Sequence, residues 1–184
     1  MKNKISLLIF DMIGLLILVA LDQLTKYMAV VFLKANDSVP IFQGILELRY
    51  LENKGAAFGM LQNQKIFFIF IALLILGVIV YVLIKTPADK KYTILHVLLV
   101  LIAAGSIGNM IDRISQDYVV DFIYFVLIDF PIFNVADIYV TCAMAGLVIL
   151  ILFGYKEEDF AFLSVSKKMT RKPQYENTDT DKNL

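Results

Sequence analysis

The chain has 184 residues, which is enough for one domain. Apolar residues make up 59% of it and the mean hydropathy is +0.74, whereas a soluble domain is about 45–50% apolar. Lys and Arg together number 17, as do Asp and Glu, so the net charge favours no acidic or basic partner and we expect no nucleic acid to bind. A single cysteine, Cys142, excludes an intrachain disulfide. The apolar surplus in so short a chain predicts that lipid is its solvent.

Four apolar runs of similar length follow one another along the chain. They cover residues of about 5–24, 66–84, 92–111 and 135–153. A helix needs about 20 mostly apolar residues to cross a bilayer, so the sequence predicts an α-helical integral membrane protein with four transmembrane helices. The first run could instead be a signal peptide, because Lys2 and Lys4 lie near its start. It is longer than the about 7–15 residues of a signal core, however, and no small-residue cleavage pattern follows it.

The basic residues predict how these helices are oriented. Four crossings place both termini on one side of the membrane, and 11 of the 17 Lys and Arg residues lie on that side. The more basic side faces the cytoplasm. Both termini are therefore predicted to be cytoplasmic, and the loops 27–65 and 112–134 extracytoplasmic.

The first outer loop carries a pattern of its own. Residues 45–52 alternate between apolar and polar side chains, which is the period-2 pattern of a strand. We expect an outer β-strand region at about 40–60. Residues 1–155 then form the membrane domain, and the polar segment 156–184 is expected to be a disordered cytoplasmic tail.

Polar residues near the ends of the apolar runs gather at one depth. They are Asp22 and Lys26, Asn53, Asn109, Asp112 and Arg113, Asp121, and Asn134 and Asp137. Polar groups in membrane spans are costly and therefore indicate function. With the predicted topology, all of these residues lie at the outer surface, where we expect a functional site.

Several kinds of chemistry are disfavoured by the remaining residues. The one histidine, His96, lies near the cytoplasmic start of the third run, and Cys142 lies within the fourth; both are interpreted as packing residues. No nucleophile is therefore paired with a base, and no zinc site is indicated. We expect no metal and no cofactor.

Paired carboxylates are left as candidate catalysts. Asp121 and Asp137 each lie in an apolar stretch, at the two ends of a short outer loop, so they can meet. Two aspartates that share one proton can activate a water molecule, one as base and the other as acid. The alternative is that Asp137 only caps the fourth helix while Asp121 pairs with Arg113.

The other aspartates on this side have simpler interpretations. Asp37, Asp117 and Asp129 lie in segments typical of turns or loops. Asp112 beside Arg113 is interpreted as a structural ion pair or a cap. Asp22 and Lys26 are four residues apart and predict a local pair on one helix face.

On the residues alone, two further classes of function stay open. One is a small ion or proton-coupled carrier, although such a protein needs access from both sides of the membrane. The other is a non-catalytic assembly factor, which would tolerate the loss of either aspartate.

Five segments, in this order and spacing, resemble the motifs of the bacterial lipoprotein signal peptidase (signal peptidase II) family. They are Asp22-Gln-Leu-Thr-Lys26, Asn53-Lys-Gly-Ala-Ala-Phe-Gly59, Ala104-Gly-Ser-Ile-Gly-Asn-Met-Ile-Asp-Arg113, Val119-Val-Asp-Phe-Ile123 and Phe133-Asn-Val-Ala-Asp137. The resemblance covers residues of about 5–155. It implies four helices with a small extracytoplasmic β-cradle in the bacterial cytoplasmic membrane, and an active site at the extracytoplasmic face.

The resemblance also implies an aspartic endopeptidase that cleaves diacylglyceryl-modified prolipoproteins just before the lipidated cysteine, and that globomycin-type antibiotics inhibit. Asp121 and Asp137 match the catalytic pair. The residues that match positions lining or supporting the substrate site are Asp22, Asn53, Gly105, Asn109, Arg113, Asn134 and Ala136. Membrane lipid is expected around the bundle, and a monomer is the default oligomeric state.

Overall fold

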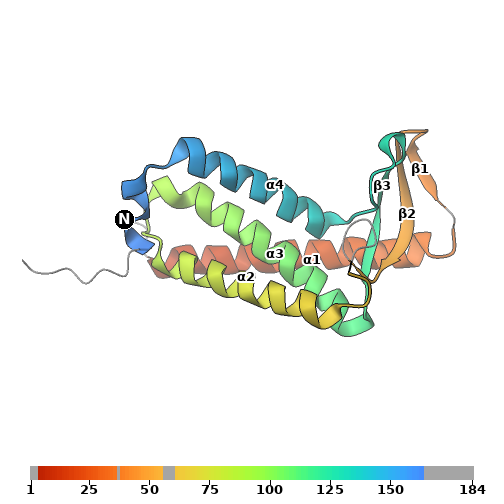
Figure 1. The fold of residues 1–184 in the computed structure, drawn as a ribbon, viewed down its shortest axis with the longest axis horizontal. Coiled ribbons are helices and arrows are strands. Elements are labelled where there is room, and N and C mark those ends of the chain that lie inside the picture. Colours follow the sequence, from red (N-terminus) through yellow and green to blue (C-terminus); the bar gives the residue numbers. More distant parts are fainter. Residues whose placement is uncertain (1–3, 37, 56–60, 164–184) are drawn as a thin grey trace, which may run out of the picture.

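The computed structural model describes residues 4–36, 38–55 and 61–163. Its main elements are α1 (Lys4–Leu33), β1 (Val39–Phe42), β2 (Leu46–Asn53), α2 (Lys65–Lys85), α3 (Thr93–Gln116), β3 (Val119–Phe125) and α4 (Val135–Ile149). A π-helical turn, Leu150–Gly154, continues α4, and short 3-10 helices cover Lys90–Tyr92, Val126–Ile128 and Glu157–Leu163. The helices lie side by side, and the sheet lies across one end of the bundle (Figure 1).

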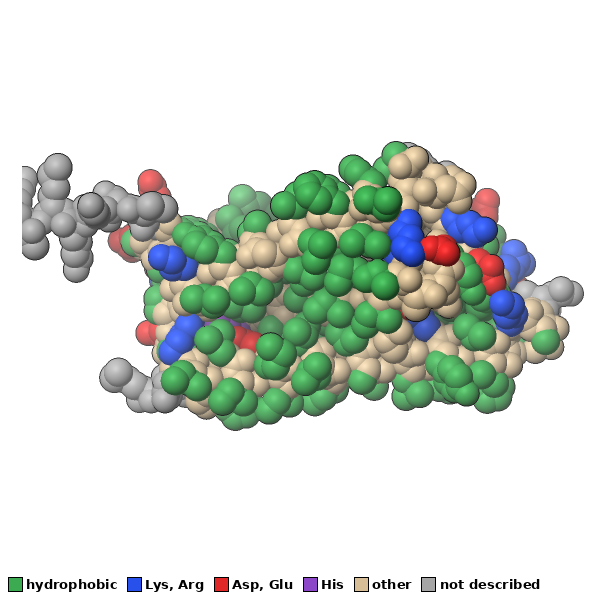
Figure 2. Space-filling view, turned by 90° about the horizontal axis from the view of Figure 1, so that it is seen from below, with side chains coloured by type: hydrophobic (Ala, Val, Ile, Leu, Met, Phe, Trp, Pro, Cys, Tyr) green, Lys and Arg blue, Asp and Glu red, His purple; other side chains and the backbone are tan. Residues whose placement is uncertain are grey.

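Within the described residues, four helices are long and apolar enough to cross a membrane, which confirms the predicted fold class. Half of the apolar window of α3 is buried, compared with 6% to 11% in the other three helices. The central helix is therefore α3, which packs against α1, α2 and α4. Figure 2 shows apolar side chains covering much of one face of the bundle, with most of the charged ones toward its two ends. Apolar side chains exposed on the outside of the bundle suit a lipid environment.

The sheet is antiparallel, with the strand order β1–β2–β3. The predicted strand at 45–52 is present as β2, whereas β3 was predicted only as an apolar segment that carries Asp121. Val119, Val120, Asp121 and Phe122 are all buried, because β3 packs against α1 and α3 as well as pairing with β2. In the pairing of β2 with β3, Leu51 lies opposite Asp121 and Asn53 opposite Val119. The end of β2 is thereby brought to the aspartate.

The first helix is longer than the predicted span of 5–24, because no helix-breaking residue interrupts the apolar sequence that follows it. Its last turns lie beside the sheet, where Ala29 and Leu33 pack against Val120 and Phe122. A helix of 30 residues is about 45 Å long, whereas the hydrocarbon core of a bilayer is about 30 Å thick. The same helix therefore crosses the membrane and supports the sheet.

Local sequence explains where the other helices begin and end. Thr86, the C-cap of α2, precedes a proline and has an extended ψ of 131°, because a residue before proline avoids the helical region. Asp117 ends α3 in the left-handed region, with a φ of 68°, which aspartate tolerates better than most residues. Asn134 begins α4 as an N-cap. The C-terminal end of α3 and the N-terminal end of α4 both lie beside the sheet, at the two ends of the short outer loop.

The segment predicted to be a disordered tail begins with folded residues. The 3-10 helix Glu157–Leu163 packs on the start of α3, where the Tyr92 hydroxyl donates a hydrogen bond of 2.9 Å to the Asp159 carbonyl. Phe162 lies edge-on to the Tyr92 ring. Aromatic contacts order this segment despite its charge. Residues 164–184 lie outside the described residues.

Candidate active site

Asn134 connects the two candidate aspartates. As the N-cap of α4, its side-chain oxygen accepts a hydrogen bond of 3.0 Å from the Asp137 main-chain N–H, and its own main-chain N–H donates to Oδ2 of Asp137 at 3.2 Å. This reciprocal pair is a capping box. The side-chain amide of Asn134 also donates to Oδ1 of Asp121 at 2.6 Å. One fully buried asparagine therefore holds a carboxylate oxygen of each aspartate.

Two further asparagines hold the remaining carboxylate oxygens. The amide of Asn109 donates to Oδ1 of Asp137 at 2.8 Å, and the amide of Asn53 donates to Oδ2 of Asp121 at 2.8 Å. Each of the four oxygens of Asp121 and Asp137 thus accepts one hydrogen bond. The donors come from β2, α3 and the N-terminus of α4, so the geometry of the pair depends on the whole outer end of the fold.

The environment of Asp121 favours its protonated form. Burial raises the pKa of the Asp121 carboxyl to about 7, and the neighbouring Asp137 carboxylate acts in the same direction. The hydrogen bonds from Asn53 and Asn134 and the charge of Lys26 oppose this increase in pKa. A pair of close, buried carboxyl groups that does not ionise fully near neutral pH is suited to acid–base chemistry.

A second layer of charged groups lies directly beneath the pair. The ammonium group of Lys26, only 3% exposed, lies 2.9 Å from Oδ2 of Asp22 and 3.1 Å from Oδ2 of Asp112. It also donates to Oδ1 of Asn109 at 2.8 Å. The predicted local pair of Asp22 and Lys26 is therefore present, and it extends from α1 to α3.

Asp112 does belong to a structural ion pair, as interpreted from the sequence, but its partner is Lys26 and not the adjacent Arg113. Oδ2 of Asp112 also accepts a hydrogen bond of 3.1 Å from the main-chain N–H of Val120 in β3. Neighbouring residues on a helix point in different directions, so Asp112 faces α1 and the sheet. Gln23 completes this layer by donating to Oδ1 of Asp112 at 2.9 Å.

Arg113 lies on the other side of α3, above a cavity. Its guanidinium group donates to the carbonyl oxygens of Gly55 at 3.2 Å and Asn109 at 3.3 Å, and it lies 4.5 Å from the ring centroid of Phe68. Among the described residues no ion pair joins Arg113 to Asp121, contrary to the alternative considered from the sequence. Asp137 does cap α4, as that alternative supposed, but it also faces the cavity.

Small residues bring α3 and α4 into close contact behind the aspartates. A Cβ atom on Gly105 would lie 2.5 Å from the carbonyl oxygen of Ala136 and 2.7 Å from Cγ2 of Val140. Ala136 is fully buried, and its N–H donates to Oδ1 of Asp22 at 2.9 Å. A Cβ on Gly108 would clash with the Asp22 carboxylate. These contacts explain why the sequence has glycine and alanine at these positions.

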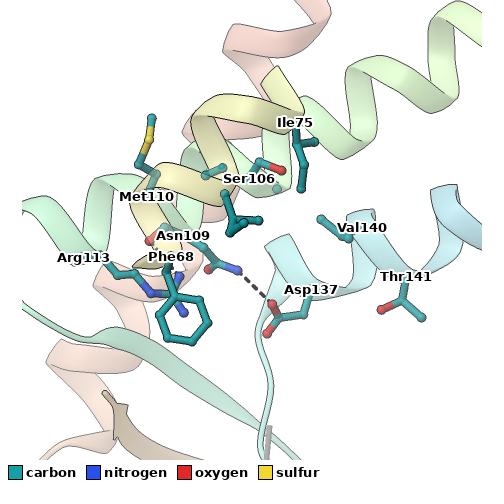
Figure 3. A pocket seen from close by; sticks show the side chains of 12 residues that line it. Phe68, Ile75, Ser106, Asn109, Met110, Arg113, Asp137, Val140 and Thr141 are labelled. Carbon is teal, nitrogen blue, oxygen red and sulfur yellow. Dashed lines mark hydrogen bonds between the residues drawn. The ribbon is translucent and has the colours of Figure 1, made fainter. Parts of the chain in front are cut away.

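The cavity beside Asp137 has a volume of about 310 Å³ and lies between α2, α3 and α4. Figure 3 shows the Asn109 amide pointing toward Asp137, with Phe68 and Arg113 beside them. The wall on the α2 side consists of Phe68, Ile71, Ala72 and Ile75. An apolar wall facing a polar one suits a ligand with both an apolar and a polar part.

All nine residues predicted for the site lie in this one cluster. The sequence interpretation missed Gln23 and Phe68 and assigned Asp112 to the wrong partner. The spacing of Asp22 and Lys26 was the one signal available for the buried charge layer, and it did not reveal the partner on α3.

Of the segment 53–59, residues 56–59 lie outside the described residues. In the part of the chain that the structure describes, no three His, Cys, Asp or Glu residues are grouped so that they could hold a metal ion.

The fold and the site define a multi-pass membrane enzyme with a buried polar centre at one end of its helices. Two solved bacterial membrane enzymes, determined at 2.3 Å and 1.9 Å resolution, are similar to the chain, with TM-scores of 0.70 and 0.68 and identities of 33% and 35%. The similarity covers 80% and 78% of this chain, and 92% and 93% of those chains.

The model of the family described as signal peptidase (SPase) II matches residues 14–153, and the chain belongs to this family of membrane peptidases. The lipoprotein signal peptidase of Streptococcus thermophilus strain CNRZ 1066 is 42% identical over 147 residues, which are 80% of this chain and 93% of that protein. The lipoprotein signal peptidase of Streptococcus pyogenes serotype M5 is 42% identical over 160 residues, or 87% and 99% of the two chains.

Proposed function

We propose that the protein is an aspartic endopeptidase that removes the signal peptide from diacylglyceryl-modified prolipoproteins by cleaving just before the lipidated cysteine. The observation that carries this proposal is the arrangement around Asn134, which holds one oxygen of Asp121 and one oxygen of Asp137. Membership of the signal peptidase II family supports a lipoprotein substrate.

The reaction begins with the carboxyl pair sharing one proton. The ionised group takes a proton from a water molecule while the water oxygen bonds to the scissile carbonyl carbon, and the protonated group gives its proton to the carbonyl oxygen. In the second step the two groups exchange roles. One takes a proton from the tetrahedral carbon's hydroxyl, the other protonates the cysteine nitrogen, and the C–N bond breaks. The signal peptide leaves with the new carboxyl group, and the pair again carries one proton.

The fixed amides make this exchange of roles possible. Because each carboxylate oxygen accepts a hydrogen bond from Asn53, Asn109 or Asn134, both groups keep their positions while a proton moves between states. Groups that are oriented before the reaction lower its barrier, because no reorganisation is needed in the transition state. Arg113 retains N–H groups beyond those that bind Gly55 and Asn109, and it lines the cavity, so it can bind a main-chain carbonyl of the substrate.

The position of the cavity suits a substrate anchored in lipid. With the topology that the basic residues predict, the sheet and the aspartates lie at the extracytoplasmic face of the bacterial cytoplasmic membrane. The acyl chains of a lipidated cysteine lie in the outer leaflet, so its scissile bond is held near the same level. This anchoring reduces the orientational freedom that the substrate loses on binding. One chain supplies the aspartates and the asparagines that hold them, so we propose that a monomer is active.

The test is cleavage of a purified diacylglyceryl-modified prolipoprotein by the detergent-solubilised protein. Asp121→Asn and Asp137→Asn are each expected to abolish cleavage before the lipidated cysteine. Asp129→Asn is the matched control, because Asp129 has a φ of 47° in an exposed turn, which asparagine also tolerates. Globomycin is expected to inhibit the wild type. Near-normal cleavage by either folded dyad variant would disprove the assignment, and cleavage of an unlipidated peptide with equal efficiency would disprove the substrate class.

A further inference from the structure

A second cavity of about 390 Å³ lies on the bundle surface between α1, α2 and α3. Its α3 wall is formed by Val100, Ala103 and Ile107, whose spacing places them on one helix face. Of the α3 residues that line the candidate active site, Gly105 and Asn109 lie on the opposite face of the helix. The two cavities share no lining residue and are therefore separate.

Asp11 is the one charged residue among those that line this second cavity. Its Oδ2 lies 2.7 Å from Nδ1 of His96, which is buried at 1% exposure. Among the described residues, the contact with His96 is the one hydrogen bond of the Asp11 carboxyl group, made by its Oδ2, and Nε2 of His96 is buried without a partner. A carboxylate oxygen facing lipid without a donor is costly, so a hydrogen-bond donor is expected to occupy the cavity beside it.

The depth of Asp11 limits what that donor can be. The Lys4 ammonium group donates to the carbonyl oxygens of Leu83, at 2.7 Å, and of Thr86, at the end of α2, and so marks the polar boundary of the bundle. Asp11 lies seven residues further along α1, about 10 Å deeper. A charged headgroup would have to leave water to reach this depth, whereas a neutral hydroxyl costs far less to bury and can donate to the carboxylate.

We propose that this cavity binds diacylglycerol, with one acyl chain between α1, α2 and α3 and the free glycerol hydroxyl donating to Asp11. Diacylglycerol combines the required groups, because its only hydrogen-bond donor lies directly beside two acyl chains. Apart from Asp11, the lining residues are apolar, including Leu15, Leu76 and Val100. They extend along α2 from Leu76 to Ile84, which is about 12 Å of helix. The site thus holds part of one chain and leaves the other in the bilayer. This proposal is independent of the proposed peptidase activity.

The test uses the full chain in phosphatidylcholine nanodiscs with a photoreactive diacylglycerol as the probe. Labelling is competed with unlabelled diacylglycerol and with its 3-O-methyl ether, which has the same chains but no hydroxyl. One hydrogen bond contributes about 1 kcal/mol, so the ether should compete about fivefold less well against the wild type. With Asp11→Leu, the two competitors should become equal. Equal competition against the wild type, or a persistent difference with Asp11→Leu, would overturn the contact.

A second variant keeps the test valid if Asp11→Leu does not fold. Val80 lines the cavity and is 53% exposed, so Val80→Trp should fill the cavity without disturbing the Asp11–His96 pair. Labelling should fall at least tenfold, while the thermal midpoint and prolipoprotein cleavage stay as in the wild type. Labelling that is unchanged in Val80→Trp, or that phosphatidylglycerol competes as well as diacylglycerol does, would show that the cavity has no such specificity.

Discussion

The ammonium group of Lys26 lies 2.8 Å from Oδ1 of Asn109, and the amide nitrogen of the same asparagine donates to Asp137. An ammonium group can only donate hydrogen bonds, so Lys26 determines which end of the Asn109 amide faces Asp137. With the amide reversed, two donors would face each other on one side and two acceptors on the other. The buried lysine therefore orients a donor of the candidate active site without touching either aspartate of the pair.

Replacing this lysine should destabilise the fold. In Lys26→Met, the buried carboxylates of Asp22 and Asp112 lose their cation, and removal of one partner from a buried ion pair costs about 3–5 kcal/mol. Lys34→Met is the matched control, because Lys34 pairs with Glu52 at the surface, with 52% of its side chain exposed, and exposed ion pairs contribute little to stability. Denaturant unfolding in detergent measures both. Equal unfolding free energies for the two variants would contradict the role of Lys26.

The two roles of Asn134 can be separated by a conservative change. Serine also caps helices well, but its shorter side chain cannot donate to Asp121 while it caps α4. Asn134→Ser should therefore keep the α4 cap and still fold, with an unfolding midpoint lowered by the lost donor to Asp121, and it should lose cleavage activity. A carboxyl group misplaced by about 1 Å can cost about 100-fold in rate. Single-turnover cleavage of the lipidated substrate gives the rate, and activity within a factor of two of wild type would show that the Asp121 contact is dispensable.

Two glycines in membrane helices should respond in opposite ways to alanine. At Gly105 the new Cβ would lie 2.5 Å from the Ala136 carbonyl oxygen, so Gly105→Ala should force α3 and α4 apart, at a cost of about 1–3 kcal/mol. At Gly77 a Cβ would meet nothing within 4 Å, and alanine favours helix by about 1 kcal/mol over glycine. Thermal unfolding of the two variants compares these effects. Loss of stability in both would show that helix packing is not the cause.

The stability of the protein should fall as the pH rises from about 4 to 7 because of Asp121. Burial raises the pKa of this group in the folded state to about 7 from its usual 3.8, so the folded state binds more protons than the unfolded state between these values. The stabilising proton is fully present below pH 4 and is lost as the pH rises through 7. In Asp121→Asn this contribution is absent, so the wild-type unfolding midpoint should decrease more steeply across this range. Parallel curves for the two proteins would exclude the raised pKa.

Hydropathy was enough to predict the four helices, because lipid requires long apolar runs. Alternation likewise predicted β2, since one of its faces is more exposed than the other. It could not predict β3, where Val119 to Phe122 are all buried and no alternation exists. The polar site residues were found because the predicted topology places them at one depth, whereas Gly105 and Ala136 were named only because they match positions of the resembled family. The contact between Asp11 and His96 joins residues 85 positions apart, and no local pattern encodes which helix faces meet.

The length of α1 has a consequence for how the protein responds to its membrane. This helix runs unbroken from Lys4 to Leu33 and packs directly against β3. Its length therefore fixes the distance of the carboxylate pair from the bilayer centre. A thicker or thinner bilayer shifts its own interface while the aspartates stay in place. A scissile bond carried by lipid moves with that interface. The rate of cleavage in vesicles of graded acyl-chain length should therefore pass through a maximum at the bilayer thickness where the scissile bond and the aspartates lie at the same depth. A rate that does not depend on thickness would show that α1 does not fix the depth of the aspartates.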